Sequence, residues 1–94
     1  MIEYLYNAVR ATAGEDITIA ADITDDSGED IKEACHIMLY DDLQLLGMYN
    51  GIYNGEVWEF TIPANITSGR IGRYWYCICV NNNSLCFKQP IYLI

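Results

Sequence analysis

The side chains with the greatest chemical potential in this sequence are four cysteines and a single histidine. Cys77, Cys79 and Cys86 lie close together, and Cys35 is followed directly by His36. Thiolates and imidazole are preferred zinc ligands, so these residues form a candidate metal set. Structural zinc favours about two to four residues between paired cysteines, whereas Cys77-x-Cys79 on an extended strand would separate the two sulfurs. We therefore expect no zinc site and interpret the cysteines as soft, buried side chains.

The same cysteines raise the question of disulfides. A turn centred on Asn82-Asn83 pairs Cys79 with Cys86 across a hairpin. In that register the pair is hydrogen-bonded, with Cβ atoms about 5.5 Å apart, whereas a disulfide needs about 3.8 Å. Residues 1–6 contain no basic region followed by an apolar one, so we expect no secretory signal. The sequence therefore favours reduced thiols.

Carboxylates are the second chemically competent group. Eight of the thirteen acidic residues lie between Glu15 and Glu33. Calcium prefers oxygen ligands, and the candidates in this stretch are Asp22, Asp25, Asp26, Glu29 and Asp30. Counted from Asp22, the EF-hand pattern fails, because Thr24 occupies the third position and the glycine comes one residue late. We expect a solvated acidic loop, with an irregular calcium loop as the alternative.

Catalytic signals are sparse. His36 lies inside an apolar stretch, no serine or cysteine sits in a nucleophile-elbow context, and no glycine-rich phosphate loop occurs. The carboxylate pair Asp41-Asp42 is first of all a turn former. We expect a protein that is not an enzyme and holds no cofactor.

Charge and hydropathy exclude two classes of partner. The net charge is −8, with five basic residues, so a phosphate backbone would be repelled and we expect no nucleic acid. No apolar run approaches the roughly 18–20 residues that a membrane helix needs, so we expect no membrane. With 94 residues, the chain is expected to form a single domain, residues 1–94.

The elements that must position these residues are predicted to be strands. Ile17 and Ile19 alternate with polar neighbours, as do Trp58 and Phe60, and Asn54-Gly55 is a strong hairpin signal. A short helical turn over 29–34 is a further expectation. The predicted strands are 2–8, 15–23, 34–40, 45–53, 56–62, 73–81 and 85–93. This number predicts an all-β fold, a seven-stranded antiparallel immunoglobulin-like β-sandwich.

Three passages carry a resemblance to a known family. They are Gly14-Glu15-Asp16-Ile17-Thr18-Ile19 leading into Asp25-Asp26-Ser27-Gly28-Glu29-Asp30-Ile31, then Trp58-Glu59-Phe60-Thr61-Ile62-Pro63-Ala64 followed by Thr67, then Gly72-Arg73-Tyr74-Trp75-Tyr76. Together they resemble the small β-sandwich domains of tailed-phage virion proteins, of the upper-baseplate N-terminal and long-tail-fibre-associated type. Where that family often carries an acidic residue after the second tyrosine, this chain has Cys77. The resemblance implies a structural module of a virion, made in the host cytoplasm, whose partners are other virion proteins or itself.

Tyr74 occupies the position at which immunoglobulin-like sandwiches carry a tyrosine corner. It lies near the start of the second-to-last predicted strand, where a tyrosine corner places its hydroxyl against upstream backbone. Immunoglobulin domains place a disulfide cysteine two residues later, and here that residue is Tyr76. We therefore expect no inter-sheet disulfide.

A lone sandwich does not explain one face of strand 73–81. If Tyr76 and Ile78 face the core, the opposite face carries Trp75 and two cysteines, where polar side chains are normal. Such a surface marks a protein contact. The predicted interface comprises His36, Met38, Tyr40, Trp75, Cys77, Cys79 and Cys86. The alternative is that the N-terminal strand or loops of the same domain cover this face.

Three functions remain open from the sequence. The first is a non-catalytic structural or adaptor protein of a phage particle, in its tail, baseplate, fibre or head decoration. The second is a glycan-binding module, in which surface tryptophan and tyrosine side chains would stack on sugar rings, with Trp58, Tyr49 and Tyr53 as alternative candidates. The third is a small acidic inhibitor or anti-defence protein.

Overall fold

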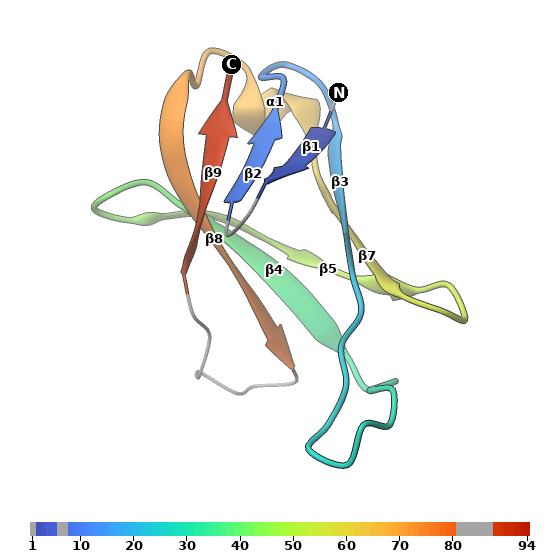
Figure 1. Cartoon of the computed structure of the whole chain (residues 1–94). Coiled ribbons are helices and arrows are strands. Elements are labelled where there is room, and N and C mark those ends of the chain that lie inside the picture. The colour runs from blue at the N-terminus through green and yellow to red at the C-terminus, as the bar shows by residue number, and fades with distance from the viewer. Residues whose placement is uncertain (1, 6–7, 81–87) are drawn as a thin grey trace.

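The computed structural model describes residues 2–5, 8–80 and 88–94, and these form two β-sheets (Figure 1). The larger sheet has six strands in the order β1-β2-β9-β8-β4-β5, and the smaller has three in the order β3-β7-β6. The elements are β1 (Ile2–Leu5), β2 (Ala8–Ala11), β3 (Ile17–Ala21), β4 (Cys35–Tyr40), β5 (Leu45–Asn50), β6 (Ile52–Tyr53), β7 (Trp58–Ile62), α1 (Ala64–Thr67), β8 (Gly72–Val80) and β9 (Gln89–Leu93). The predicted all-β class is confirmed.

The predicted number of strands and the purely antiparallel arrangement are wrong. The described chain forms nine strands, because range 2–8 ends early and β2 follows as a separate strand that was not predicted. β2 runs parallel to β9, with Val9 opposite Ile91. Its sequence, Ala-Val-Arg-Ala, has only one β-branched residue, so its propensity gives little signal and its pairing with a distant strand decides the structure.

The predicted strand 45–53 is divided at Gly51, where the chain leaves the larger sheet and enters the smaller one. A Cβ at Gly51 would lie 2.5 Å from Cε1 of Phe60 and 3.0 Å from Cε3 of Trp58. The crossing therefore requires a residue without a side chain, because the backbone passes directly over two core rings.

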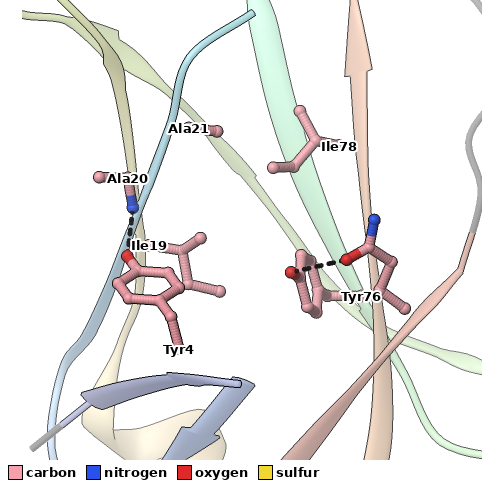
Figure 2. A pocket seen from close by; sticks show the side chains of 7 residues that line it. Tyr4, Ile19, Ala20, Ala21, Tyr76 and Ile78 are labelled. Carbon is pink, nitrogen blue, oxygen red and sulfur yellow. Dashed lines mark hydrogen bonds between the residues drawn. The ribbon is translucent and has the colours of Figure 1, made fainter. Parts of the chain in front are cut away.

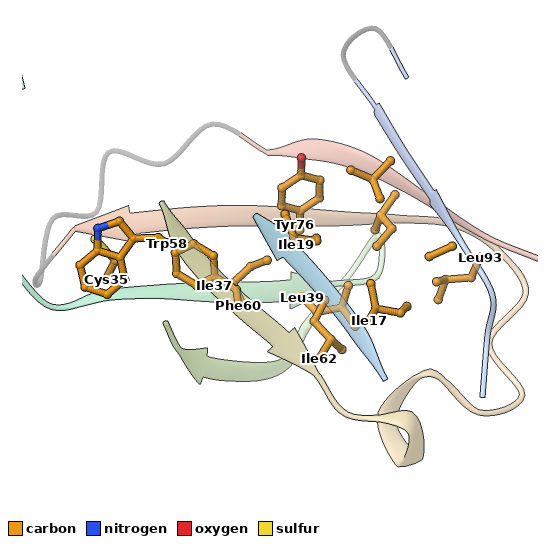
Figure 3. Close-up of a cluster of buried hydrophobic side chains, with 13 residues drawn as sticks. Ile17, Ile19, Cys35, Ile37, Leu39, Trp58, Phe60, Ile62, Tyr76 and Leu93 are labelled. Atoms are coloured by element: carbon orange, nitrogen blue, oxygen red, sulfur yellow. The ribbon is translucent and has the colours of Figure 1, made fainter. Parts of the chain in front are cut away.

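Side chains at every second position meet between the sheets (Figure 3). The predicted alternation is confirmed on β3, where Ile17 and Ile19 are buried, and on β7, where Trp58, Phe60 and Ile62 are buried. The Trp58 indole N–H donates to the Ile31 carbonyl at 2.7 Å, so this core ring leaves no polar atom unpaired. Burial of each large apolar side chain contributes about 1.5–3 kcal/mol.

The acidic stretch forms an irregular loop instead of the expected helical turn over 29–34. Thr24 forms an isolated antiparallel bridge with Asp30. One carboxylate oxygen of Asp25 accepts the N–H groups of Ser27 and Glu29 at 2.9 and 3.0 Å. A side chain that satisfies these backbone donors favours a turn over a helix.

The two sheets are joined at one side by a tyrosine hydroxyl. Ala20 of β3 donates its backbone N–H to the hydroxyl of Tyr4 on β1 at 2.8 Å. On the other side the chain itself connects β5 with β6 through Gly51. The layers are therefore linked along both margins.

Helix α1 was not predicted, and its last residue anchors it. Thr67 is fully buried, accepts the Gly14 N–H at 3.0 Å and donates to the Glu15 carbonyl at 3.2 Å.

Among the described residues, no helix is long and apolar enough to span a bilayer.

The Thr67 anchor leads to a stability prediction. Thr67→Val keeps the side-chain shape but leaves the Gly14 N–H and the Glu15 carbonyl without this partner. We expect the free energy of unfolding to fall by about 1–3 kcal/mol in urea denaturation. Thr61→Val is the matched control, because the Thr61 hydroxyl is exposed and its hydrogen-bond partner is the equally exposed Thr18 hydroxyl. An equal loss in both variants would contradict the anchoring role.

Candidate functional site

The strand register brings the predicted interface residues onto one face of the larger sheet. Ile37, Leu39 and Tyr76 belong to the buried core, so their neighbours along β4 and β8 point to the opposite, outer face. The cross-strand pairs on that face are His36 with Cys79, Met38 with Cys77, and Tyr40 with Trp75. Cys86 lies outside the described residues.

Exposure on this outer face differs from the expectation for the cysteines. Cys77 and Cys79 are each only 3% exposed, although neither belongs to the core cluster. His36, Met38, Tyr40 and Trp75 are partly exposed. The physical reason is side-chain length. The short thiol side chains lie close to the sheet and are covered by the longer side chains of the residues paired with them. The cysteines therefore form the floor of the surface, and the larger residues present it.

Trp75 is held in a fixed orientation by two charged neighbours. The guanidinium carbon of Arg73 lies 4.9 Å from the indole ring centroid, within cation–π distance. The indole N–H donates to a carboxylate oxygen of Asp42 at 3.1 Å. Since both contacts are intramolecular, little side-chain entropy remains to be lost when a partner binds.

Tyr40, next to Trp75 across the strands, is held in a similar way. The Lys88 ammonium lies 4.5 Å from its ring centroid, and its hydroxyl contacts the Met38 sulfur at 3.3 Å. The two aromatic rings and their two cations thus form one ordered surface unit.

Strand β5 adds two side chains to this surface that the sequence analysis missed. Leu45 pairs with Tyr40 and is 48% exposed, and Met48 pairs with Met38 and is 57% exposed. A bulge between Leu39 and Tyr40 in the register shifts Met48 to the outer face. The turn at Asp41-Asp42 implies that the chain reverses and that Leu45 pairs with Tyr40. The position of Leu45 on this face could therefore have been predicted from the sequence.

We call this surface the outer-face patch. It consists of apolar and aromatic side chains from four adjacent strands: Met38, Tyr40, Leu45, Met48, Trp75 and Pro90. Its rim carries charges of both signs, because Asp42 accepts the Trp75 indole N–H and Glu3 pairs with Arg10. Of the five basic residues, Arg73 and Lys88 contact the patch, and Arg10 lies on the same face, paired with Glu3 at 2.6 Å. In Figure 1 the acidic loop between β3 and β4 lies at the far end of the molecule from α1.

The redox state expected for Cys79 is wrong, because Cys79 is disulfide-bonded. Cys35 and Cys77 are free thiols. The expected register is confirmed where Trp75 pairs with Pro90, but the ladder ends at Tyr76 and Gln89. The spacing argument against a disulfide assumed that the regular β8–β9 ladder continues as far as Cys79. The described ladder does not extend that far, so the assumed Cβ separation does not apply.

The free thiols lead to a labelling prediction. Burial raises the pKa of both Cys35 and Cys77, while the Lys88 charge partly opposes the rise at Cys77. A raised pKa lowers the thiolate fraction at neutral pH, and burial blocks access. We expect iodoacetamide to label neither thiol in the native protein and both in denaturant without reductant, with the Cys79 peptide unlabelled. Mass spectrometry checks this, and labelling of Cys79 in denaturant would contradict the disulfide.

The candidate metal sets are not brought together. Cys35 lies in the core while His36 points to the outer face, and Cys79 is disulfide-bonded. In the acidic loop, the Asp25 carboxylate accepts the backbone N–H of Ser27 within its own turn. The Asp30 carboxylate accepts a hydrogen bond from the Tyr53 hydroxyl at 3.1 Å. Within the described parts of the chain, no group of three or more His, Cys, Asp or Glu residues could hold a metal ion.

The side chains considered for sugar stacking are largely unavailable for it. Trp58 is 5% exposed and stacks on Phe60 within the core. Tyr49 and Tyr53 are partly buried against that core. The aromatic side chains of the outer-face patch are therefore better placed for contact with a ligand.

A cavity of about 350 Å³ opens between the sheets beside β1, β3 and β8 (Figure 2). Its polar groups are already engaged: the Tyr4 hydroxyl accepts the Ala20 N–H, and the Tyr76 hydroxyl donates to the Gln89 side-chain oxygen at 3.2 Å. Burial raises the pKa of Tyr76, so this hydroxyl stays protonated. The polar side chains that line the cavity are therefore held by contacts within the chain.

Comparison with protein-family models, with curated proteins and with solved structures finds no match. The functional argument therefore depends on the geometry of this chain.

Tyr74 does not act as a corner residue. Its side chain packs against the core, and its hydroxyl makes no hydrogen bond to any described residue. The buried Thr67 hydroxyl instead joins the segment before β8 to the turn before β3. Thr67 is among the residues that carry the family resemblance, but its anchoring role was not predicted from the sequence.

Proposed function

We propose that this protein is a non-catalytic structural or adaptor module that binds another protein through the outer-face patch. The observation that supports this most directly is the position of the patch. Solvent-facing positions of an antiparallel sheet are normally polar, yet Leu45 and Met48 are about half exposed next to Trp75 and Tyr40. An apolar centre with aromatic and methionine side chains inside a charged rim is typical of protein interfaces.

We infer that the sandwich is immunoglobulin-like. The order β9-β8-β4-β5 matches strands G-F-C-C′ of a variable-type sheet, and β3-β7-β6 matches B-E-D of the facing sheet. The outer-face patch would then lie on the G-F-C-C′ sheet. Cys35, which lies in the described core, is a free thiol.

We propose a virion as the place of action, with other virion proteins or a second copy as partner. This rests on the resemblance of residues 14–31, 58–64 and 72–76 to β-sandwich domains of tailed-phage virion proteins. An adaptor in a particle needs a preorganised surface and no catalytic group, and the fixed Trp75 and Tyr40 rings meet that need.

Site-specific photo-crosslinking tests the proposal. A photoreactive phenylalanine analogue at Met38 places the probe in the patch, and the same analogue at Thr18 places it on the exposed face of the smaller sheet. In the cells that make the protein, we expect one discrete protein adduct from position 38 and none from position 18. Recovery of that adduct in purified virus particles would support the virion location.

Two outcomes would overturn the proposal. Equal adducts from both positions would mean that the patch has no special affinity. If no protein adduct forms and the protein binds glycans on an array in a way that requires Trp75, the glycan-binding alternative is favoured.

A further inference from the structure

The four sheet edges differ in how they are protected against pairing with another strand. β6 has only two residues, β1 carries the Glu3–Arg10 ion pair, and on β3 the Ala20 N–H is occupied by Tyr4. β5 has six residues without charge or proline, and no described strand pairs with its outer side. Natural proteins block edges with short strands, charges, proline or bulges. The only such device at β5 is the bulge near Leu46, at one end of the strand.

The backbone groups that β5 directs outward follow from its register. Gly51 donates its N–H to the Cys35 carbonyl at 2.8 Å, which makes that pair hydrogen-bonded. Hydrogen-bonded and non-hydrogen-bonded pairs alternate along an antiparallel ladder. Met48 and Asn50 are therefore at non-hydrogen-bonded positions opposite Met38 and His36, and their N–H and C=O groups point away from β4.

We propose that this edge pairs with the same edge of a second copy, in an antiparallel, two-fold symmetric dimer. With the axis at Tyr49, Met48 of one copy lies opposite Asn50 of the other. Two such pairs exchange about four backbone hydrogen bonds. An isologous contact of this kind needs a surface that complements itself.

Charge supports a second copy as the occupant. Each chain carries a net charge of −8, so two copies repel unless the contact avoids the acidic residues. Residues 43–53 contain no charged residue, and they include the whole of β5. This stretch exposes Leu43, Leu45, Met48 and Ile52, so the side chains near the proposed contact are uncharged and largely apolar.

The dimer goes beyond the proposed function, because it uses the backbone of β5 rather than the patch. A two-fold axis perpendicular to the sheet keeps both outer faces on the same side. Leu45 and Met48 of the two copies would then join their outer-face patches into one larger, bivalent surface.

Sedimentation velocity over about 5–500 μM tests the dimer. We expect the wild-type protein to dimerise in this range and Asn50→Pro to associate at least about ten-fold more weakly, because proline removes an outward N–H that β4 does not use. Thr18→Pro is the matched control. Its N–H points away from β7, since Ala20 on the same strand donates outward to Tyr4, and we expect unchanged association.

Asn50→Lys gives a second test that does not alter the backbone. It places like charges on both sides of the two-fold axis, and we expect the same loss of association. A wild-type protein that stays monomeric at about 500 μM, or unchanged association in both Asn50 variants, would overturn the proposal. If Trp75→Glu abolishes association and the Asn50 variants do not, self-association uses the patch, which overturns the edge dimer but leaves the proposed function standing.

Discussion

Trp75→Glu is expected to weaken binding to the crosslinked partner at least about 30-fold while the protein stays folded. Trp75 lies at the centre of the outer-face patch, between Tyr40 and Pro90 on adjacent strands. Glutamate removes the ring that Arg73 covers and places a second carboxylate near Asp42. Titration calorimetry or surface plasmon resonance measures the loss, and far-UV circular dichroism checks the fold.

Thr18→Glu is the matched control for Trp75→Glu. It introduces the same charge on an exposed strand position of the other sheet, so the net charge changes equally. The double variant Met38→Glu with Trp75→Glu should abolish binding. If Trp75→Glu binds as tightly as Thr18→Glu, the patch is not the contact surface.

Gly51→Ala is expected to reduce the free energy of unfolding by about 3 kcal/mol, near the upper end of overpacking effects. The added Cβ would lie 2.5 Å from Cε1 of Phe60, whose side chain is fully buried. Because the core around Phe60 is close-packed, the ring has no free space to move into. Urea denaturation followed by Trp fluorescence measures the change.

Gly47→Ala distinguishes this mechanism from a general intolerance of glycine substitution. Its Cβ would also meet an aromatic side chain, but the atom it meets is the hydroxyl end of Tyr49, on the edge strand β5. That side chain is only partly buried and can move, so we expect a loss of less than about 1 kcal/mol. Equal losses in both variants would contradict the crossing geometry described for Gly51.

The sequence was most informative where its period was clear. Alternation in residues 17–21 and 58–62 correctly placed Ile19, Phe60 and their neighbours in the core, because a strand buried on one face must show period two. It was least informative for β2, whose identity depends on parallel pairing with β9 across most of the chain length. Long-range pairing of a short strand leaves no local pattern.

The candidate site was predicted in part for the same reason. Placing His36, Met38, Tyr40 and Trp75 on one face needs only the period of two strands, and the register confirms that arrangement. Met48 could not be found, since a bulge changes the face without any sequence signal. The burial of Cys77 and Cys79 depends on how far neighbouring side chains reach, which periodicity does not report.

Hydroxyl-radical footprinting tests the docking role of the outer face most directly. Methionine and aromatic side chains are the reporters, and the outer-face patch supplies Met38, Met48 and Trp75, while Tyr4, which is 54% exposed on β1, serves as the reference. Comparing the purified chain with the protein in its native assembly, we predict that oxidation of Met38, Met48 and Trp75 falls several-fold and that of Tyr4 is unchanged. Equal oxidation of Met38 and Trp75 in both states would contradict the account.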